Sequence, residues 1–286
     1  MALITSLASQ VSGLSGAIVV VDDASPEPMP DVDGATVVRR EINGGFGAAV
    51  NTGLALVTTD LVAVLNSDLV VEDGFLEELV DAALPWLPAI VAPQVVTHGH
   101  TGATSFRFPG PGTVLAQGIN LVAARRDSGW ASRLIGEDKP AHPDDTHLVD
   151  WVSGAAFMAP TETLRSVGGF DERFHMYNEE VDLQRRLRER GIPAVYVGSV
   201  RVEHIGFGSS DPSKRERWQL ESWQRYADKW GWEGRLKAAV ATASAINLVT
   251  DGLRRTLGRD VHPYAEWQRR RTLAREVWSD QARRAS

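Results

Sequence analysis

Residues 61–68 read Leu-Val-Ala-Val-Leu-Asn-Ser-Asp, an uninterrupted apolar run followed by three polar residues. Residues 17–23, Ala-Ile-Val-Val-Val-Asp-Asp, follow the same plan. A short apolar run that ends in turn-forming residues is typical of a strand buried on both faces. A shorter run at 35–39 and a helix-like stretch at 48–57 lie between the two. Strands that alternate with helices predict an α/β fold, with a mostly parallel central sheet flanked by helices.

The rest of the chain predicts helices at residues 74–84 and 174–190 and strands at 150–160 and 194–197. Residues 97–150 are rich in Gly, Pro, His and Asp and predict an irregular excursion. We expect one domain at 1–212, with halves at 1–95 and 96–212, and a helical segment at 213–286. No internal repeat is present in the sequence.

Composition sets the protein class. Of 286 residues, 43% are hydrophobic and 23% charged, which is typical of a globular protein. The chain has no cysteine, which excludes a disulfide scaffold, a zinc–thiolate site and a cysteine nucleophile. The sequence contains no run of eighteen apolar residues, so it predicts no membrane span. The N-terminus lacks the basic region of a signal peptide. We therefore expect a cytoplasmic protein.

Charge divides the chain unevenly. Residues 1–200 hold 13 Lys and Arg against 26 Asp and Glu, whereas residues 201–286 hold 17 against 11. The acidic part argues against a nucleic-acid partner. The basic end, with an apolar stretch at 238–249 followed by arginines, predicts either contact with an anionic membrane surface or an ordinary solvated helical face.

Acidic residues follow two of the expected strands. Because ligands of α/β sheets bind at the carboxyl ends of strands, Asp22, Asp23 and Asp68 are candidate binding residues. Asp68 could hold a divalent cation against a diphosphate, or Asn66-Ser67-Asp68 could be an ordinary turn. The Asp22-Asp23 pair could accept hydrogen bonds from a nucleobase or ribose, or could cap a turn.

Three other patterns carry a choice between chemistry and structure. Gly44-Gly45-Phe46-Gly47 could cradle phosphates or form a tight turn, and the dinucleotide fingerprint that it begins fails at Val50. Glu179 and Glu180 open an expected helix, where acids can act as a general base or favour the helix dipole. His204 could be a metal ligand or a structural histidine.

The order and spacing of these patterns resemble family 2 inverting glycosyltransferases of the GT-A fold, in particular the rhamnosyltransferase-like branch that builds bacterial surface polysaccharides. The resemblance covers about residues 1–210. The stretches that carry it are Val-Asp-Asp-Ala-Ser at 21–25, Asn-Gly-Gly-Phe-Gly-Ala-Ala-Val-Asn at 43–51, Leu-Asn-Ser-Asp at 65–68, Trp-Val-Ser-Gly-Ala-Ala-Phe at 151–157, Val-Gly-Gly-Phe-Asp-Glu-Arg-Phe at 167–174 and Tyr-Asn-Glu-Glu-Val-Asp-Leu at 177–183.

The resemblance implies a role for each matching residue. Glu180 takes the place of the catalytic base, with Glu179 beside it, and Asp68 with His204 would hold Mg²⁺ or Mn²⁺. Asn66 stands where the first acid of the metal motif usually is. The implied donor-binding residues are Asp22, Asp23, Gly45, Phe46, Asn51 and Asn66. The implied acceptor-binding residues are Trp151, Gly154 and Ala155.

The resemblance also implies substrates and partners. The donor would be a nucleotide-diphosphate sugar, dTDP-rhamnose or a UDP-sugar, and the acceptor a saccharide or a lipid-linked saccharide. A homodimer is a further expectation. The family's first strand is missing here, so we expect either a true start upstream or a degenerate nucleotide-sugar-binding paralogue. A nucleotidyltransferase would need a glycine-rich, basic N-terminal phosphate loop, which this sequence lacks.

Overall fold

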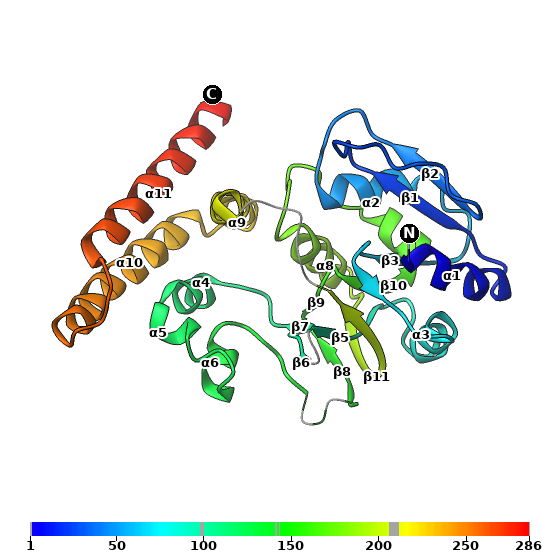
Figure 1. Ribbon diagram of the computed structural model, residues 1–286, viewed down its shortest axis with the longest axis horizontal. Helices are drawn as coiled ribbons and strands as arrows, with labels where there is room; N and C mark the ends of the chain where they lie inside the picture. Colours follow the sequence, from blue (N-terminus) through cyan, green and yellow to red (C-terminus); the bar gives the residue numbers. More distant parts are fainter. Residues whose placement is uncertain (1, 98–99, 141, 143, 206–211, 286) are drawn as a thin grey trace. The chain divides into compact units, whose positions relative to one another are not determined.

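The computed structural model describes residues 2–97, 100–140, 142, 144–205 and 212–285 (Figure 1). The chain forms two compact units. The sheet unit comprises Met1–Phe108 and Asp138–Ser209, and the helical unit comprises Pro109–Glu137 and Ser210–Ser286. The expected division at 212 and this one differ in the segment 109–137, which groups with the C-terminal helices.

The sheet unit contains three sheets. Strand β1 (Ile18–Asp22) pairs in parallel with β2 (Ala35–Arg39), apart from the main sheet. The main sheet has the order β3 (Leu61–Leu65), β10 (Ala156–Pro160), β5 (Ile90–Thr97), β11 (Ala194–His204) and β4 (Leu69–Val70), with β6 (His100–Thr101) on β5 and β8 (Thr146–Val149) on β11. Two short strands, β7 (Ser105–Phe106) and β9 (Trp151–Val152), form the third sheet.

The main sheet is mixed, so the prediction of a mostly parallel sheet is corrected. Within its described pairs, only β5 and β11 run in parallel, and β10 is antiparallel to both β3 and β5. The physical reason is that a strand covered on both faces has the same apolar run whichever way it points. Its direction is set by the connections, which the pattern of side chains does not encode.

Strands β1 and β3 belong to separate sheets. Helix α1 (Ala2–Gly13) packs Leu7 into a cluster that also includes Ile18 and Leu61, on one face of these strands. Helix α2 (Phe46–Leu54) lies against β1, and a Cβ at Gly53 would be 3.4 Å from Val21. Two helices therefore hold β1 to the sheet unit.

The remaining helices of the sheet unit are α3 (Phe75–Ala83), the 3₁₀ helix η1 (Leu84–Trp86), α7 (Thr161–Ser166) and α8 (Glu179–Glu189). The helix predicted at 174–190 begins only at Glu179, because Tyr177 and Asn178 have φ of 69° and 61°. Left-handed residues cannot continue a right-handed helix. The strand predicted at 150–160 is likewise divided, into β9 and β10, by a turn at Gly154.

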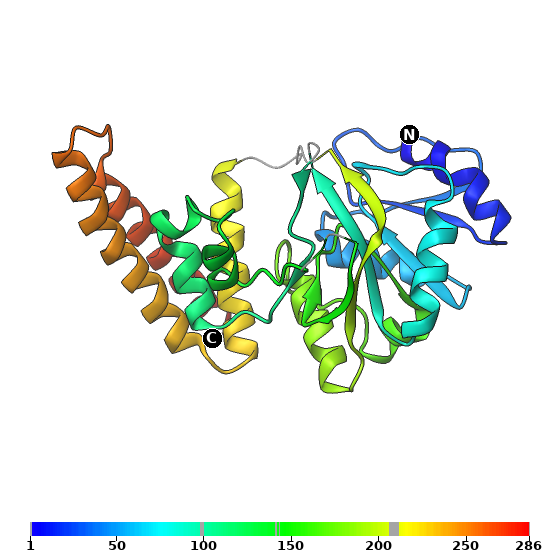
Figure 2. The ribbon, with the colours of Figure 1, turned by 90° about the horizontal axis from the view of Figure 1, so that it is seen from below.

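The helical unit consists of α4 (Pro111–Gly118), α5 (Asn120–Ala123), α6 (Gly129–Leu134), α9 (Pro212–Lys229), α10 (Glu233–Thr256) and α11 (Pro263–Ala285). Helix α10 contacts α4, α9 and α11 (Figure 2). Residues 97–150 thus contain three helices where irregular structure was predicted. The signal for the first of them was Pro111, a residue favoured at the first position of a helix. No helix in the described part of the chain is long and apolar enough to cross a membrane.

Candidate active site

Two adjacent carboxylates, Glu179 and Glu180, open helix α8. The preceding residue, Asn178, is left-handed and buried, so the helix starts abruptly beneath it. Glu179 is only 5% exposed. The Oε2 atoms of both glutamates are buried and have no hydrogen-bond partner among the described residues. Buried acceptors without partners are rare in folded proteins, and where they occur a catalytic role or a bound water or ion commonly explains them.

Burial decides the protonation of this pair. Loss of water raises the pKa of Glu179 well above its ordinary value, and the neighbouring charge of Glu180 adds to the effect. Burial also raises the pKa of Glu180, partly offset by backbone N–H groups of Glu180 and Val181. A carboxylate whose pKa moves toward neutrality can take up a proton near physiological pH. The pair is therefore suited to general base chemistry.

The wall facing Glu180 is built from a glycine and an aromatic ring. A Cβ on Gly154 would lie 3.5 Å from the Cβ of Glu180 and 3.3 Å from Cε1 of Phe46. Phe46 is fixed in turn by an edge-to-face contact with Phe170, at 5.7 Å between ring centroids. A methyl group at position 154 would therefore already be in contact with both the acid and the ring, and a larger side chain would need more space. Gly154 and Phe46, predicted for acceptor and donor respectively, thus meet at Glu180.

Asp68 and His204 form a second polar pair. The Nε2 atom of His204 lies 3.1 Å from Oδ1 of Asp68. Backbone pairing sets this distance, because His204 is opposite Leu69 in the β4–β11 ladder and the Ile205 N–H donates to the Asp68 carbonyl. The structure brings together the two residues that the sequence predicted as metal ligands.

A backbone hydrogen bond joins the two polar pairs. The N–H of Asn66, two residues before Asp68, donates to the carbonyl of Ala155 at 2.9 Å. Ala155 follows Gly154, which faces Glu180. The Asn66–Asp68 turn and the Gly154–Ala155 turn are therefore held side by side. The turn that contains Asp68 thus lies beside the turn whose Gly154 faces Glu180 of helix α8.

Asp22 is enclosed by its own loop. Its carboxylate accepts hydrogen bonds from the N–H groups of Ser25 at 2.8 Å and Met29 at 3.0 Å, and from the Arg39 guanidinium. These bonds hold the pKa of Asp22 well below its ordinary value, and the side chain is only 1% exposed. The interpretation of Asp22 as a donor contact stays a prediction, and it requires some of these bonds to be exchanged.

Asp23 shapes the glycine loop. Its carboxylate accepts from the N–H of Gly44 at 3.0 Å and of Gly45 at 2.7 Å, and it pairs with Arg40 at 2.8 Å. Gly45 has φ of 87°, and a Cβ there would overlap the carbonyl oxygen of His175. Position 45 therefore requires glycine for two reasons: its backbone has a positive φ, and the segment that precedes α8 approaches it closely.

Asn51 holds the glycine-rich loop that leads toward α8. Its amide donates to the Phe170 carbonyl and to Glu172, both at 2.9 Å, and its oxygen accepts from the Phe170 N–H at 2.8 Å. Arg186 supports the same loop by donating to the carbonyls of Val167 and Gly169. The structure therefore gives Asn51 a positioning role beside the predicted donor site.

Trp151 is held flat by its neighbours. Its ring stacks on Phe106 at 4.2 Å between centroids and 13° between planes, and its Nε1–H donates to the Arg107 carbonyl at 3.0 Å. The next residue, Val152, is fixed at both its backbone N–H and C=O by the Gln184 side chain of α8. A rigid aromatic face therefore lies three residues before Gly154. A role for Trp151 in acceptor binding stays a prediction.

Comparison with known proteins identifies the family. Residues 2–121 match the family model described as Glycosyl transferase family 2. The "Pre-mycofactocin glycosyltransferase" of Mycobacterium tuberculosis is 35% identical over 213 residues, which cover 72% of this chain and 39% of that protein. The chain belongs to glycosyltransferase family 2. The "N-acetylglucosaminyl-diphospho-decaprenol L-rhamnosyltransferase" of the same organism is 30% identical over 182 residues, covering 57% of this chain and 56% of that protein.

Solved structures agree with the fold of this family 2 chain. The mannosyltransferase PcManGT from Pyrobaculum calidifontis, in complex with GDP-Man and Mn²⁺, superimposes with a TM-score of 0.54 at 15% identity and covers 98% of this chain. GalNAc-T7 with UDP, GalNAc and Mn²⁺ gives a TM-score of 0.51 at 15% identity and covers 74% of this chain. The GT-A fold expected from the sequence is confirmed. The chain spans 39% and 56% of the lengths of the two mycobacterial relatives.

The residues at Asp68 fit a divalent cation in part. A carboxylate oxygen and an imidazole nitrogen are donors that Mn²⁺ accepts, and Mg²⁺ or Mn²⁺ commonly takes its other ligands from phosphates and water. No group of three or more His, Cys, Asp or Glu side chains with metal-binding geometry occurs in the part of the chain that the structure describes. Two protein ligands at this turn therefore suit a cation that arrives with a diphosphate better than a permanently enclosed one.

One residue of this site was not predicted from the sequence. Asn178 precedes the two glutamates, is 6% exposed, and its Nδ2 atom is buried without a hydrogen-bond partner in the described structure. Three consecutive residues, Asn178, Glu179 and Glu180, therefore each carry an enclosed polar atom without a hydrogen-bond partner among the described residues. The available signal was the residue type, because asparagine tolerates the left-handed conformation better than most residues.

Proposed function

We propose that this family 2 protein is an inverting glycosyltransferase, with Glu180 as the catalytic base. The observation that carries the proposal is the enclosed Oε2 of Glu180, which has no hydrogen-bond partner among the described residues. Glu180 lies on α8 beside Gly154, and the next residue, Ala155, is bonded to the turn that leads to the Asp68–His204 pair. The donor is a nucleotide-diphosphate sugar, dTDP-rhamnose or a UDP-sugar. The acceptor is a saccharide or lipid-linked saccharide, in the synthesis of a cell-surface polysaccharide.

The proposed reaction needs one proton transfer and one substitution. The Glu180 carboxylate takes the proton of the acceptor hydroxyl, whose oxygen forms a bond to the anomeric carbon of the donor. The bond from that carbon to the diphosphate oxygen breaks, and the electron pair leaves with the diphosphate. Attack from the opposite side inverts the configuration. Mg²⁺ or Mn²⁺ bound by Asp68 and His204 would neutralise charge on the diphosphate.

The protein's own residues prepare this step. Gly154 places no side chain between Glu180 and Phe46, and the ring of Trp151, stacked on Phe106, offers a flat apolar surface for a sugar. Gly45 and the Asp23 carboxylate shape the loop that we assign to the donor. Two relatives are named as rhamnosyltransferases, and for this reason we propose dTDP-rhamnose ahead of the other donors.

The test is donor binding with and without Mn²⁺. Thermal stabilisation is measured across UDP-, dTDP- and GDP-sugars, because a ligand that binds only the native state raises the melting temperature. We expect a metal-dependent shift with one nucleotide class. Asp68→Ala should abolish the metal dependence, whereas Asp73→Ala, an exposed acid five residues away, should leave it intact. The absence of a shift with every donor would contradict the proposal.

A second candidate is a nucleotide-sugar-binding paralogue without turnover. The observation that favours it is that β1, which ends at Asp22 just before Asp23, pairs with β2 in a sheet separate from the main sheet. The same experiment separates the two candidates when nucleoside diphosphate release from the donor is also measured. Binding with release supports the transferase, and binding without release supports the paralogue.

A further inference from the structure

The outer face of helix α10 carries no charge along most of its length. Between Ala238 and Leu253 the helix has one charged residue, Asp251, and that residue is 7% exposed. The exposed positions along this stretch and its C-cap are Ala238, Ala241, Thr242, Ala245, Val249, Leu253 and Leu257, which we call the α10 outer face. A solvent-facing helix surface normally carries polar and charged residues.

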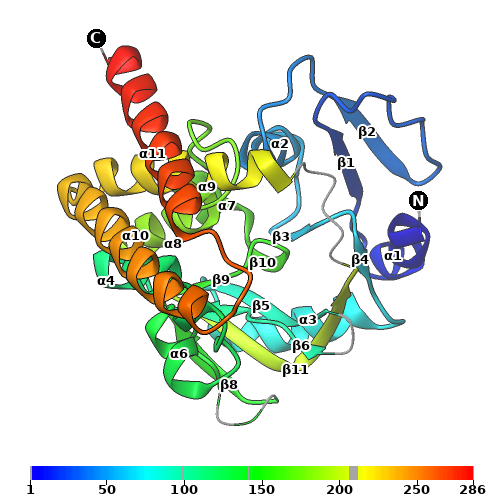
Figure 3. The same cartoon turned by 60° about the vertical axis from the view of Figure 1, so that its left-hand side comes forward.

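The packing of α10 fixes which side faces outward. Its inner side is buried at positions spaced three or four residues apart, Leu236, Ala239, Ala243, Asn247 and Asp251. Asn247 bonds both the Gly118 carbonyl at 2.7 Å and the Asn120 N–H at 2.9 Å, and Asp251 accepts from the Asn120 amide. These bonds prevent α10 from rotating to hide the other side. Figure 3 shows α10 and α11 lying together in the helical unit.

The apolar part of this face grows toward the C-terminal end of α10. Val249 is 64% exposed, Leu253 62% and Leu257 81%, one helical turn apart. Tyr264, at the start of α11, is 60% exposed. Large apolar side chains at such exposure would gain free energy if a partner removed them from water. Tyrosine is also a residue enriched where a membrane meets water.

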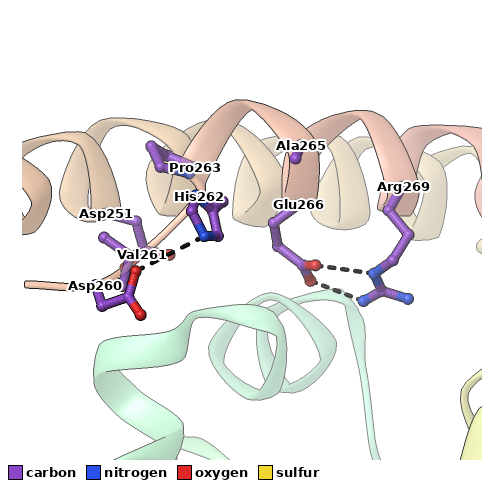
Figure 4. A pocket seen from close by; sticks show the side chains of 8 residues that line it. All are labelled: Asp251, Asp260, Val261, His262, Pro263, Ala265, Glu266 and Arg269. Atoms are coloured by element: carbon purple, nitrogen blue, oxygen red, sulfur yellow. Dashed lines mark hydrogen bonds and ion pairs between the residues drawn. The ribbon is translucent and has the colours of Figure 1, made fainter.

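The acidic residues near this end are mostly matched by bases. Figure 4 shows the pocket at the α10–α11 turn, where Glu266 bonds Arg269 and Asp260 lies 3.7 Å from His262. Asp251 pairs with Arg254. The structure records no acidic partner for the exposed Arg235, Arg255 and Arg259 among its described residues. The whole helical unit holds 19 Lys and Arg against 12 Asp and Glu, while the sheet unit holds 11 against 25.

From these observations we infer that the α10 outer face docks on an anionic phospholipid bilayer. An uncharged helix face with large apolar residues and flanking arginines suits an interfacial helix, which lies in the membrane surface without crossing it. A second copy of the chain is a poorer occupant. Arg235 lies at one end of the face, and Arg255 and Arg259 at the other, so a two-fold pairing of α10 in either direction places cation against cation.

The inference deepens the proposed function, on which it rests for its biological purpose. A lipid-linked saccharide acceptor presents its sugar at the membrane surface, and docking by α10 would bring the enzyme to the same surface. The binding itself depends only on the helical unit. Its failure can therefore be measured separately from a failure of donor binding.

The experiment is flotation of the full chain with vesicles of phosphatidylcholine and phosphatidylglycerol in equal amounts, against vesicles of phosphatidylcholine alone. We expect flotation with the anionic vesicles at low salt only. The double variant Leu253→Gln, Leu257→Gln should lose at least about tenfold in vesicle affinity, because two exposed leucines no longer enter the lipid. Arg255→Gln with Arg259→Gln should weaken binding less and reduce its salt dependence.

The matched control is Leu84→Gln, which removes a comparably exposed leucine, at 55%, from the sheet unit and should leave flotation unchanged. Each variant is also tested for the donor-induced thermal shift, which should be unaltered by changes on α10. Wild-type protein that stays with neither vesicle would overturn the inference. So would equal flotation of all variants, or a dimer in sedimentation that the double variant converts to monomer. Flotation without a donor shift would leave the inference standing and remove the proposed donor chemistry.

Discussion

Two pairs of adjacent acids in the sheet unit carry the same formal charge and have opposite surroundings. Asp22 and Asp23, at the end of β1, are bonded by backbone N–H groups and arginines. Glu179 is buried and Glu180 half-buried at the start of α8, and one carboxylate oxygen of each is enclosed without a partner among the described residues. The fold satisfies the hydrogen-bonding oxygens of the first pair and leaves an oxygen in each member of the second pair unsatisfied.

The difference shows how one fold assigns acids to structure or to chemistry. Hydrogen bonds to the ionised form lower the pKa of Asp22, so it stays a carboxylate at any pH the protein meets. Burial without compensating bonds raises the pKa of Glu179 and of Glu180, so these can gain a proton. A carboxyl group with a lowered pKa stays ionised and can hold a loop through hydrogen bonds, but it is a weak base. A carboxyl group with a raised pKa is a stronger base, which is the property that we propose for Glu180.

The largest expected effect is on turnover when the helix pair is broken. Glu180→Gln keeps the shape of the side chain and removes its basicity, so we expect the rate of nucleoside diphosphate release to fall by about 10²–10⁴-fold. Donor binding should change little, because the proton is taken from the acceptor. Rates and donor-induced thermal shifts measured on the same preparation check both statements.

The control for this variant is another glutamate in the first turn of a helix. Glu162 occupies that place in α7, with a side chain 81% exposed and paired with Arg165. Glu162→Gln should leave turnover unchanged. Near-normal activity in Glu180→Gln would mean that another group is the base. It would also contradict the proposal that the acids of α8 act in proton transfer while those after β1 support the fold.

The second expected effect is the pH dependence of turnover. A base must be ionised to act, and the raised pKa of Glu180 means that ionisation is complete only at higher pH than for an ordinary carboxyl group. As pH is lowered, the rate should therefore begin to fall above the range in which an ordinary carboxyl group titrates. A rate–pH profile that is flat down to the ordinary carboxyl range near 4.5 would contradict the desolvated environment of the helix pair.

How far the sequence predicts this site depends on how local the cause is. The strand that ends at Asp22, the turn at Asp68 and the acids at Glu179 and Glu180 follow from short apolar runs and the residues after them. The start of α8 was placed five residues early, because the left-handed turn at Tyr177 is enforced by its surroundings and not by glycine. The direction of β10 could not be predicted either, since a fully buried strand looks alike both ways.

Contacts between distant segments account for the other differences. Nothing in the residues near Asp22 indicates that Arg39 would close over it, and nothing near Asn51 indicates that its amide would clamp Phe170. Such bonds form only when the sheet and its loops assemble. The sequence thus predicted which acids to consider, while only the structure shows that the Asp22 carboxylate is fully hydrogen-bonded and that Glu179 and Glu180 each keep an oxygen without a partner among the described residues.

A smaller effect is expected when the strand pair loses its hold on the glycine loop. Asp23→Asn removes one charged acceptor from the N–H groups of Gly44 and Gly45 and the partner of Arg40. The loop should become less ordered, and donor affinity should fall by about tenfold, since hydrogen bonds to charged groups contribute roughly 1.5–3 kcal/mol. Calorimetric titration with the donor identified above measures the loss. Unchanged affinity would show that Asp23 supports the fold but not the donor loop.

The smallest expected effect is on stability, and it tests the hydrogen bonds to the Asp22 carboxylate. Asp22→Asn replaces a carboxylate that accepts from Ser25, Met29 and Arg39, so we expect the melting temperature to fall by a few degrees at pH 7. A lowered pKa in the folded state stabilises the protein above the ordinary carboxyl pKa of 3.8 and contributes less below it. The deficit of the variant should therefore shrink as pH drops toward 3. Asp31→Asn, which changes an exposed acid in the same loop, should show no such deficit at either pH. A deficit that is the same at both pH values would mean that the shape of the Asp22 side chain, and not its charge, holds the loop.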